Sequence, residues 1–223
     1  MISSAHSLPL FPKWKTPEKT DPLSYETIAR KAGYRLLAGV DEAGRGPLAG
    51  PVVAAAVIIP EDKILPGVKD SKQMTEKARD EAFSVINEAA VAVGIGVVSH
   101  QFIDKFNILR ASLEAMKRAV LSLDALPEYL LIDGIHAVPL PIPQRCLIKG
   151  DQISQSISAA SVMAKVYRDR IMRSYDKQFP VYGFSKNKGY GTSMHFKALV
   201  QHGPTPIHRR TFKGVCSLDK GKT

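Results

Sequence analysis

The sequence predicts a mixed α/β fold, a sheet flanked by helices that opens with an antiparallel hairpin. Two apolar runs, 36–40 and 52–59, have the length of buried strands and are separated by a glycine-rich turn. Farther along, strand-like and helix-like segments alternate, as in proteins whose parallel strands are joined by helices. A hairpin followed by alternation favours a mixed sheet over a purely parallel one.

The remaining elements follow from start and stop signals. The segment 23–33 predicts a short helix that Gly33 closes, and Thr75 and Asn107 are suited to begin two amphipathic helices. Further helices are expected at about 154–178 and 192–202, further strands at 91–98, 129–132 and 146–148, and a loop rich in Gly, Lys and Tyr at 183–191. Four prolines among lysines predict a mobile arm over residues 1–22.

Composition limits the class of protein. A chain of 223 residues with 44% hydrophobic residues can form one domain with a small C-terminal appendage. No apolar run approaches the ~18–20 residues of a membrane span, and the N-terminus lacks the features of a secretory signal. Cys146 and Cys216 fit neither a zinc spacing nor a disulfide framework. We therefore expect a cytoplasmic protein.

The net charge of +10 comes from the end of the chain. Residues 1–160 contain 18 Lys and Arg and 18 Asp and Glu, whereas residues 161–223 contain 13 and 3. Such a one-sided basic block favours a surface for a polyanion, with nucleic acid the natural candidate. A basic face that is merely solvated is the alternative.

Acidic residues follow three of the predicted strands. Asp41 and Glu42 come directly after the first strand, Asp133 after the strand at 129–132, and Asp151 after the strand at 146–148. If these strands are neighbours, four carboxylates meet at one edge of the sheet. That is enough to bind two divalent cations ~3.5–4 Å apart, the arrangement used for phosphodiester hydrolysis. The alternative is that each acid is an ordinary cap or turn residue.

The turn between the first two strands has its own requirements. Asp41 and Glu42 can share one site only if the chain turns there, because neighbouring side chains on a regular strand point to opposite faces. Gly44 and Gly46 permit such a turn. A nucleotide-binding loop is excluded, since the spacing is G-x-G-x-x-x-G and a strand follows. A hairpin with solvated acids remains the alternative.

These motifs, in this order, resemble those of the type 2 ribonucleases H (ribonuclease HII) of bacteria. The resemblance covers about 23–212 and rests on Asp41-Glu42 before Gly44-Arg45-Gly46, Asp70-Ser71-Lys72, Leu131-Ile132-Asp133-Gly134, Ile148-Lys149-Gly150-Asp151, the run 158–166, Lys188-Gly189-Tyr190-Gly191-Thr192 and His208-Arg209-Arg210-Thr211-Phe212. It implies a ribonuclease H-like five-stranded sheet at 23–180 and a basic helical extension at 181–223 that contacts nucleic acid. It also implies cleavage that depends on Mg²⁺ or Mn²⁺. The substrates would be RNA/DNA hybrids and duplex DNA with single ribonucleotides, cut on their 5′ side to leave 3′-hydroxyl and 5′-phosphate ends.

The same resemblance assigns roles to residues. The metal ligands would be Asp41, Glu42, Asp133 and Asp151. Gly44, Arg45 and Gly46 would read the ribose 2′-hydroxyl, the group that separates RNA from DNA. Tyr190 would stack on the sugar 3′ to the ribonucleotide, although a tyrosine that packs on the body is the alternative. Further substrate contacts would come from Ser71, Lys72, Lys149, Lys165, Arg209 and Arg210; for Lys165 a structural role is the alternative.

Other functions compete with this one. A hybrid-binding module without cleavage would gain nothing from acids beside the phosphates, and a DNA nuclease would leave the Gly-Arg-Gly loop and Tyr190 unexplained. His195 and His208 are expected to be structural or to contact phosphates. Residues 216–223 lack the signature of a sliding-clamp peptide, and a monomer is expected.

Overall fold

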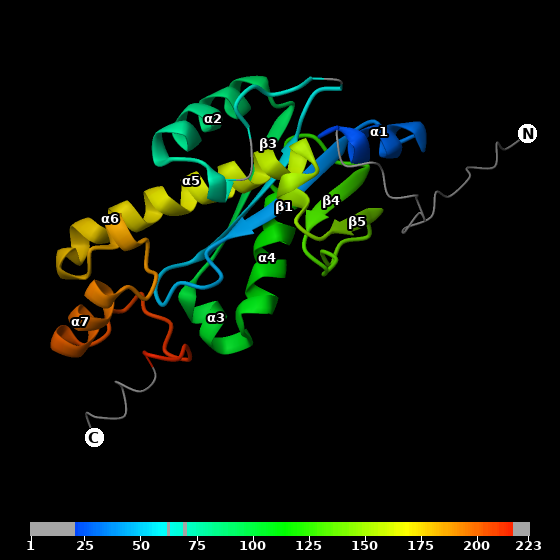
Figure 1. Ribbon diagram of the computed structural model, residues 1–223. Coiled ribbons are helices and arrows are strands. Elements are labelled where there is room, and N and C mark those ends of the chain that lie inside the picture. Colours follow the sequence, from blue (N-terminus) through cyan, green and yellow to red (C-terminus); the bar gives the residue numbers. More distant parts are fainter. Residues whose placement is uncertain (1–20, 62, 69–70, 216–223) are drawn as a thin grey trace, which may run out of the picture.

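A five-stranded sheet forms the centre of the molecule (Figure 1). The computed structural model describes residues 21–61, 63–68 and 71–215. The strands are β1 (Leu37–Ala43), β2 (Val52–Ile58), β3 (Ala92–Val98), β4 (Tyr129–Asp133) and β5 (Gln144–Leu147), in the order β3-β2-β1-β4-β5. β1 and β3 pair antiparallel with β2, whereas β4 runs parallel to both β1 and β5. The predicted mixed sheet is confirmed.

Two long helices cover opposite faces of the sheet. In Figure 1, α4 (Ile108–Leu121) lies on one side, and α5 (Gln155–Gln178) and α2 (Glu76–Ala89) lie on the other. Even-numbered residues of β1, such as Val40, join the core with α4, while odd-numbered ones face α5. At Gly39 a Cβ atom would lie 2.0 Å from the main chain of Ser156. A glycine there lets the backbone of α5 cross directly over β1.

The helix starts largely follow the sequence predictions. Thr75, Asn107, Ser154 and Thr192 each accept a hydrogen bond from a main-chain N–H of the first helical turn. The helix at 23–33 is observed as α1 (Ser24–Lys31), and Gly33 follows it with φ +101°. The sequence analysis missed α3 (His100–Phe106), a two-turn helix that Ser99 caps between β3 and α4.

The last part of the described chain packs on the end of α5. A 3₁₀ turn (η3, Pro180–Tyr182), α6 (Phe184–Asn187) and α7 (Ser193–His202) surround a small core that includes Phe184 and Leu199. The chain then returns to the turn after β1, where His208 forms a β-bridge with Ala49. This return places the C-terminal basic motif directly behind the glycine-rich loop.

Some expectations fall outside what the structure describes. Most of the predicted arm at 1–22, Asp70 of the Asp-Ser-Lys motif, Cys216 and the clamp-peptide segment at 216–223 lie in the undescribed parts. The division of the chain at residues 180 and 181 stays a prediction. Within the described residues, no helix is long and apolar enough to cross a membrane.

Candidate active site

Three carboxylates meet at one edge of the sheet. Asp41 lies near the end of β1, Asp133 ends β4, and Asp151 lies in a 3₁₀ turn (η2, Gly150–Gln152) after β5. One oxygen from each of the three lies within 4.8 Å of the others. They meet because β1, β4 and β5 run parallel, so that the ends of all three strands reach the same edge.

Glu42 lies differently from the other acids. We expected β1 to end at Val40 and the chain to turn at the acids, and this was wrong. The strand continues to Ala43, with Asp41 opposite Ala55 and Glu42 opposite Ala54. Glu42 therefore faces the α4 side, where it lines a cavity of about 210 Å³ with Asp133 and Met116. Its carboxylate accepts a hydrogen bond from Arg45 at 3.1 Å.

The three clustered acids are poorly compensated. Burial, and then the charges of Glu42 and Asp133, raise the pKa of Asp41 well above its ordinary value, despite hydrogen bonds from Ser161 and the Glu42 amide. Burial also raises the pKa of Asp133, although the Gly150 amide donates to it at 2.7 Å. Lys72 forms an ion pair with Asp151 at 2.7 Å. The cluster holds more negative charge than its neighbours balance.

This donor set fits a divalent metal ion. Clustered carboxylate oxygens suit Mg²⁺ and Mn²⁺, whereas sites for softer metals use thiolates or imidazoles. Burial and then neighbouring carboxylates raise the pKa of Asp41 and Asp133, and a cation here would favour their ionised forms. The residues present therefore fit the metal that the sequence analysis expects, with Asp41, Asp133 and Asp151 as the ligands that the structure brings together.

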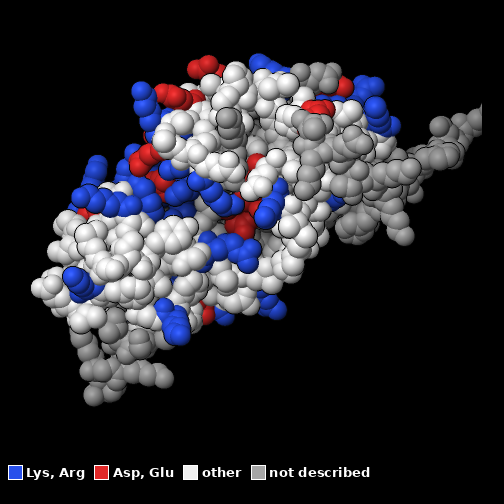
Figure 2. Space-filling view, viewed as in Figure 1, with Lys and Arg blue, Asp and Glu red and all other residues white. Residues whose placement is uncertain are grey.

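Asp41, Asp133 and Glu42 open onto a hollow that the glycine-rich turn and Tyr190 also line. This hollow has a volume of about 340 Å³ and includes all three residues of Gly44-Arg45-Gly46 together with Lys72 and Lys165. Figure 2 shows acidic surface deep in a hollow of this face, with Lys and Arg on its rim. The structure thus brings most of the expected site residues to one place.

Tyr190 lies against the glycine-rich turn. A Cβ atom added at Gly46 would lie 3.5 Å from Cε1 of the Tyr190 ring, and the tyrosine is 45% exposed. Gly44 takes φ +98°, and a Cβ atom there would clash with the side chain of Arg168 at 2.1 Å. Glycine is therefore required at position 44 by its positive φ and by the close contact with Arg168. At position 46 the absence of a side chain leaves space beside the Tyr190 ring.

Two buried arginines hold the loop after β1 from behind. Arg168 of α5 donates to the carbonyls of Pro51, Ala49 and Lys188. Arg209 donates to the carbonyls of Gly44, Arg45, Gly50 and Pro51. Burial lowers the pKa of Arg168 to about 10 and that of Arg209 to about 9, so both are charged at neutral pH. The exposed Arg45-Gly46 peptide is the part of the loop that faces the hollow.

The other expected substrate contacts differ in whether they reach this hollow. Arg209 has no exposed surface, so the expectation that it touches substrate is wrong; its guanidinium is committed to the loop carbonyls. Ser71 lines the hollow but is largely buried, with its hydroxyl 2.8 Å from that of Ser161. Lys149 and Arg210 are exposed but are not among the residues that line the hollow. Lys165 lines the hollow and pairs with Asp169 at 2.6 Å.

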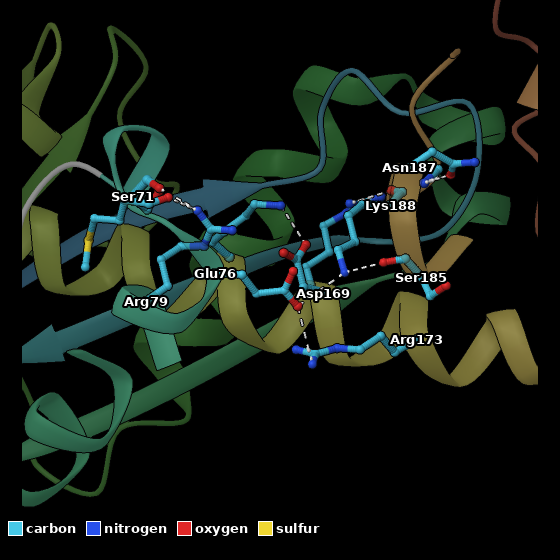
Figure 3. Close-up of polar contacts among 12 residues, drawn as sticks. Ser71, Glu76, Arg79, Asp169, Arg173, Ser185, Asn187 and Lys188 are labelled. Carbon is cyan, nitrogen blue, oxygen red and sulfur yellow. Dashed lines mark hydrogen bonds and ion pairs between the residues drawn. The ribbon is translucent and has the colours of Figure 1, made fainter. Parts of the chain in front are cut away.

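Basic residues continue from the hollow along α5 (Figure 3). The carboxylate of Glu76, at the start of α2, lies between Arg173 at 3.4 Å and Lys188 at 3.6 Å. Arg79 of α2 donates to the carbonyl of Ser71 and so braces the Asp-Ser-Lys motif. Arg173 extends the cationic surface past Lys165, whereas Lys188 is largely buried.

Sequence reasoning gave no role to Ser161 or Arg168, and it expected His195 and His208 to be structural or to contact phosphates; both are fully buried, so the phosphate contact is wrong and the structural role fits. Arg168 follows Ala160 and Ala164 at intervals of four, so its place on the buried face of the helix was available as a signal. Ser161 lies on the same helix and hydrogen-bonds to Asp41. The two histidines are separated by thirteen positions and nothing in their spacing indicates that they touch.

Comparison with known proteins agrees with this geometry. The sequence model of the family described as Ribonuclease HII matches residues 38–215. A ribonuclease HII of Geobacter sulfurreducens is 54% identical over 209 residues, which cover 94% of this chain and 95% of the relative. The crystal structure of ribonuclease H2 from Pyrococcus horikoshii OT3 aligns with a TM-score of 0.70 and 28% identity, covering 83% of this chain and 97% of that one.

A second solved structure, that of the PCNA:RNase HII complex from Archaeoglobus fulgidus, aligns with a TM-score of 0.68 and 25% identity, over 80% of this chain and 95% of that one. The predicted ribonuclease H-like fold is confirmed by these likenesses and by the strand order. With its family model, its relatives and its clustered acids in agreement, this chain belongs to the ribonuclease HII family.

Proposed function

We propose that this protein is an endonuclease dependent on Mg²⁺ or Mn²⁺ that hydrolyses the RNA strand of RNA/DNA hybrids. It also cuts on the 5′ side of single ribonucleotides in duplex DNA and leaves 3′-hydroxyl and 5′-phosphate ends. The observation that carries the proposal is the convergence of the Asp41, Asp133 and Asp151 carboxylates, two of which, Asp41 and Asp133, line the same hollow as the Gly44-Arg45-Gly46 turn and Tyr190.

The acids would hold the metal. Asp41, Asp133 and Asp151 supply converging oxygens, and Glu42, beside Asp133 on the α4 face, is the fourth proposed ligand. Bound divalent cations lower the pKa of an attacking water and neutralise charge that develops on the phosphate. Lys72, which pairs with Asp151, is positioned to contact a substrate phosphate when a cation takes over the neutralisation of that acid.

The glycine-rich turn and Tyr190 would recognise the ribonucleotide. The two buried arginines occupy carbonyls of the loop, so the turn keeps its shape when substrate arrives. The exposed Arg45-Gly46 peptide would read the 2′-hydroxyl. The Tyr190 ring, half exposed beside Gly46, would stack on the following sugar and so favour an RNA–DNA junction.

The basic surface would hold the duplex. Lys165 and Arg173 lie along α5 from the hollow, and Arg210 adds an exposed cation beyond the loop. Each phosphate that such residues neutralise contributes a slope of about −0.9 to log K against log[salt]. Binding is therefore expected to weaken steeply as salt rises.

The deciding experiment uses three matched duplexes: all-DNA, an RNA/DNA hybrid, and DNA with one ribonucleotide. Each is incubated with the protein in Mg²⁺, in Mn²⁺ and in chelator, and the products are sized and their ends identified. We expect metal-dependent cleavage of the hybrid and a cut 5′ to the single ribonucleotide, with the all-DNA duplex intact. Cleavage of the all-DNA duplex at a similar rate would contradict the proposed substrate.

The variant Asp41→Asn separates cutting from binding. It removes one metal ligand and keeps the size of the side chain, so we expect it to lose cleavage while its affinity for the duplex changes little. Near-wild-type turnover by this variant would overturn the assignment of the acids. Binding without cleavage by the wild-type protein in either metal would instead favour the binding module.

A further inference from the structure

A pair of buried histidines joins the C-terminal segment to Tyr190. His195 in the first turn of α7 and His208 have no exposed surface, and their Nε2 atoms lie 2.9 Å apart. The ring of Phe184 packs edge-on against His195 at a centroid distance of 5.3 Å, and that of Tyr182 lies 5.3 Å from His208. Neither histidine reaches the acids or lines the hollow, so the proposed hydrolysis gives them no role.

The hydrogen-bond partners of the two Nδ1 atoms determine which nitrogen of each imidazole ring carries the proton. The main-chain N–H of Thr205 lies 2.9 Å from Nδ1 of His208 and can only donate, so this nitrogen accepts. The Tyr190 carbonyl lies 2.9 Å from Nδ1 of His195 and can only accept, so that nitrogen carries a proton. Burial lowers the pKa of both rings, that of His208 to about 3, so each is neutral.

Two neutral rings with these partners can pair in only one sense. His208 carries its proton on Nε2 and donates it to Nε2 of His195, which is unprotonated. The result is a one-directional chain of hydrogen bonds from the Thr205 amide through both rings to the Tyr190 carbonyl. Because the carbonyl also accepts from the Thr192 amide at 2.8 Å, both of its lone pairs are used.

Arg209, the residue after His208, holds the glycine-rich turn, the other proposed recognition element. Arg209 donates to the carbonyls of Gly44 and Arg45, and its amide donates to the Leu48 carbonyl at 2.8 Å. Two consecutive residues therefore reach the two substrate-reading elements, His208 through His195 to Tyr190 and Arg209 to the glycine-rich turn. The segment 205–209 thus links the two elements from behind, beside the direct hydrogen bond from the Leu48 amide to the Gly189 carbonyl.

We propose that the His195–His208 pair is a positioning device that holds Tyr190 against Gly46 and thereby sets the preference for a single ribonucleotide over a long hybrid. The inference rests on the proposed role of Tyr190 and deepens it. Neither histidine touches substrate; both act through the main chain of residue 190. Loss of the hydrogen bond between the two histidines removes one restraint on the 187–192 loop, so that the Tyr190 ring samples a wider range of positions.

The variant His208→Asn tests the device. The asparagine oxygen can still accept from the Thr205 amide, but the shorter side chain cannot reach His195. We expect the ratio of kcat/KM on the single-ribonucleotide duplex to that on the long hybrid to fall about three- to tenfold, the size of one neutral hydrogen bond. His202→Asn is the matched control. His202 is exposed on α7, the helix that contains His195, and its substitution should leave the ratio unchanged.

A double-mutant cycle distinguishes positioning from general damage. In a Tyr190→Ala background, His208→Asn should lower the ratio no further, because its effect passes through the ring that is already gone. An equal further fall in the double variant would overturn the inference. If His208→Asn does not fold, His195→Asn takes its place, because its amide can still donate to Tyr190 while the link to His208 is lost.

The imidazole nitrogens of the unliganded wild-type protein give a test that needs no cleavage. We expect nitrogen NMR to show two neutral rings near neutral pH in opposite tautomers, Nδ1–H for His195 and Nε2–H for His208. Identical tautomers, or a charged ring, would refute the chain of hydrogen bonds. A wild-type protein that cuts both duplexes equally would contradict the proposed role of Tyr190, while the spectrum would still decide whether the pair exists.

Discussion

The two halves of the proposed site differ in how well their polar groups are satisfied. In the acid cluster, three carboxylates lie within 4.8 Å of one another, and burial and mutual repulsion raise the pKa of Asp41 and Asp133. Behind the glycine-rich turn, Arg168 and Arg209 are equally buried, yet their guanidinium groups donate to seven carbonyl contacts within 3.3 Å. Of the three acids, Asp151 forms an ion pair, with Lys72, whereas the donors of both guanidinium groups are directed at carbonyl oxygens.

This difference follows from what each half would do. A recognition surface works best when its shape is fixed before substrate arrives, because ordering it during binding costs free energy. A metal site has the opposite requirement, since acids that neighbouring cations already neutralised would bind a metal weakly. The protein would thus gain stability from the framework behind the turn and lose some at the acids, a common trade at active sites.

The largest effect should come from breaking the framework. Arg209→Met leaves buried carbonyls of the 44–51 loop without donors, and each such group costs about 1–3 kcal/mol. We expect the free energy of unfolding to fall by about 3 kcal/mol or more, as measured by urea denaturation. Arg210→Met is the matched control, because this neighbouring arginine is exposed; we expect a change within about 0.5 kcal/mol. Equal effects of the two would show that the buried contacts add little.

The acid cluster should respond in the opposite direction. Asp41→Asn removes one repelling charge and keeps an oxygen that can accept from Ser161, so we expect the metal-free protein to become more stable by about 0.5–2 kcal/mol. Asp104→Asn is the control, because its carboxylate accepts hydrogen bonds from Thr211 and the Arg210 amide. That variant should be less stable than wild type. A loss of stability in Asp41→Asn would mean that the cluster is better compensated than its geometry indicates.

The fold and the position of the acids could largely be predicted from the sequence. The caps at Thr75 and Asn107, the helix that starts near Ser154, and the three acids after parallel strands all depend on local pattern, which a single sequence displays. The error at Glu42 came from placing the end of β1 at Val40. The alternation of side chains on an unbroken strand put this acid on the other face, where it meets Arg45.

The framework could not be predicted in the same way. The count of 13 Lys and Arg over residues 161–223 does not say which of them are buried; the interval of four after Ala160 and Ala164 indicates it for Arg168, but no local pattern indicates it for Arg209. Their burial depends on contacts with carbonyls more than a hundred positions away, such as that of Pro51. The histidine pair depends likewise on the return of residues 205–209 to α7. Charge composition shows a basic region but not which side chains face solvent.

A pH series should give a smaller effect that separates the halves. Because burial raises the pKa of Asp41 and Asp133 in the folded state, the metal-free protein binds protons there more tightly than the unfolded chain does. Their contribution therefore destabilises the metal-free protein as pH rises above the ordinary carboxylate value of about 4. Bound Mg²⁺ should reverse this, by about 1.4 kcal/mol when its concentration is ten times Kd.

The measurement is the difference in Tm between Mg²⁺ and chelator as a function of pH. We expect this difference to shrink as pH is lowered from neutrality, because protons compete with the cation for the same oxygens. In Asp41→Asn the difference should be small at every pH. A difference in the wild-type protein that grows on acidification would contradict the assignment of these carboxylates as the metal site.

The smallest effect should come from Glu76, which lies at the start of α2 beside Arg173 and Lys188 (Figure 3). Its carboxylate pairs with Arg173 and Lys188 at 3.4 and 3.6 Å, where a backbone phosphate of a duplex could be bound instead. Glu76→Gln should lower stability by at most about 0.5 kcal/mol, since exposed ion pairs contribute little. It should tighten duplex binding a few-fold at low salt, because Arg173 and Lys188 no longer have to give up the Glu76 carboxylate in order to bind a phosphate. Glu81→Gln makes the same charge change on α2 beside Lys77, so equal tightening by both variants would show that only net charge matters and that Glu76 does not occupy a phosphate position.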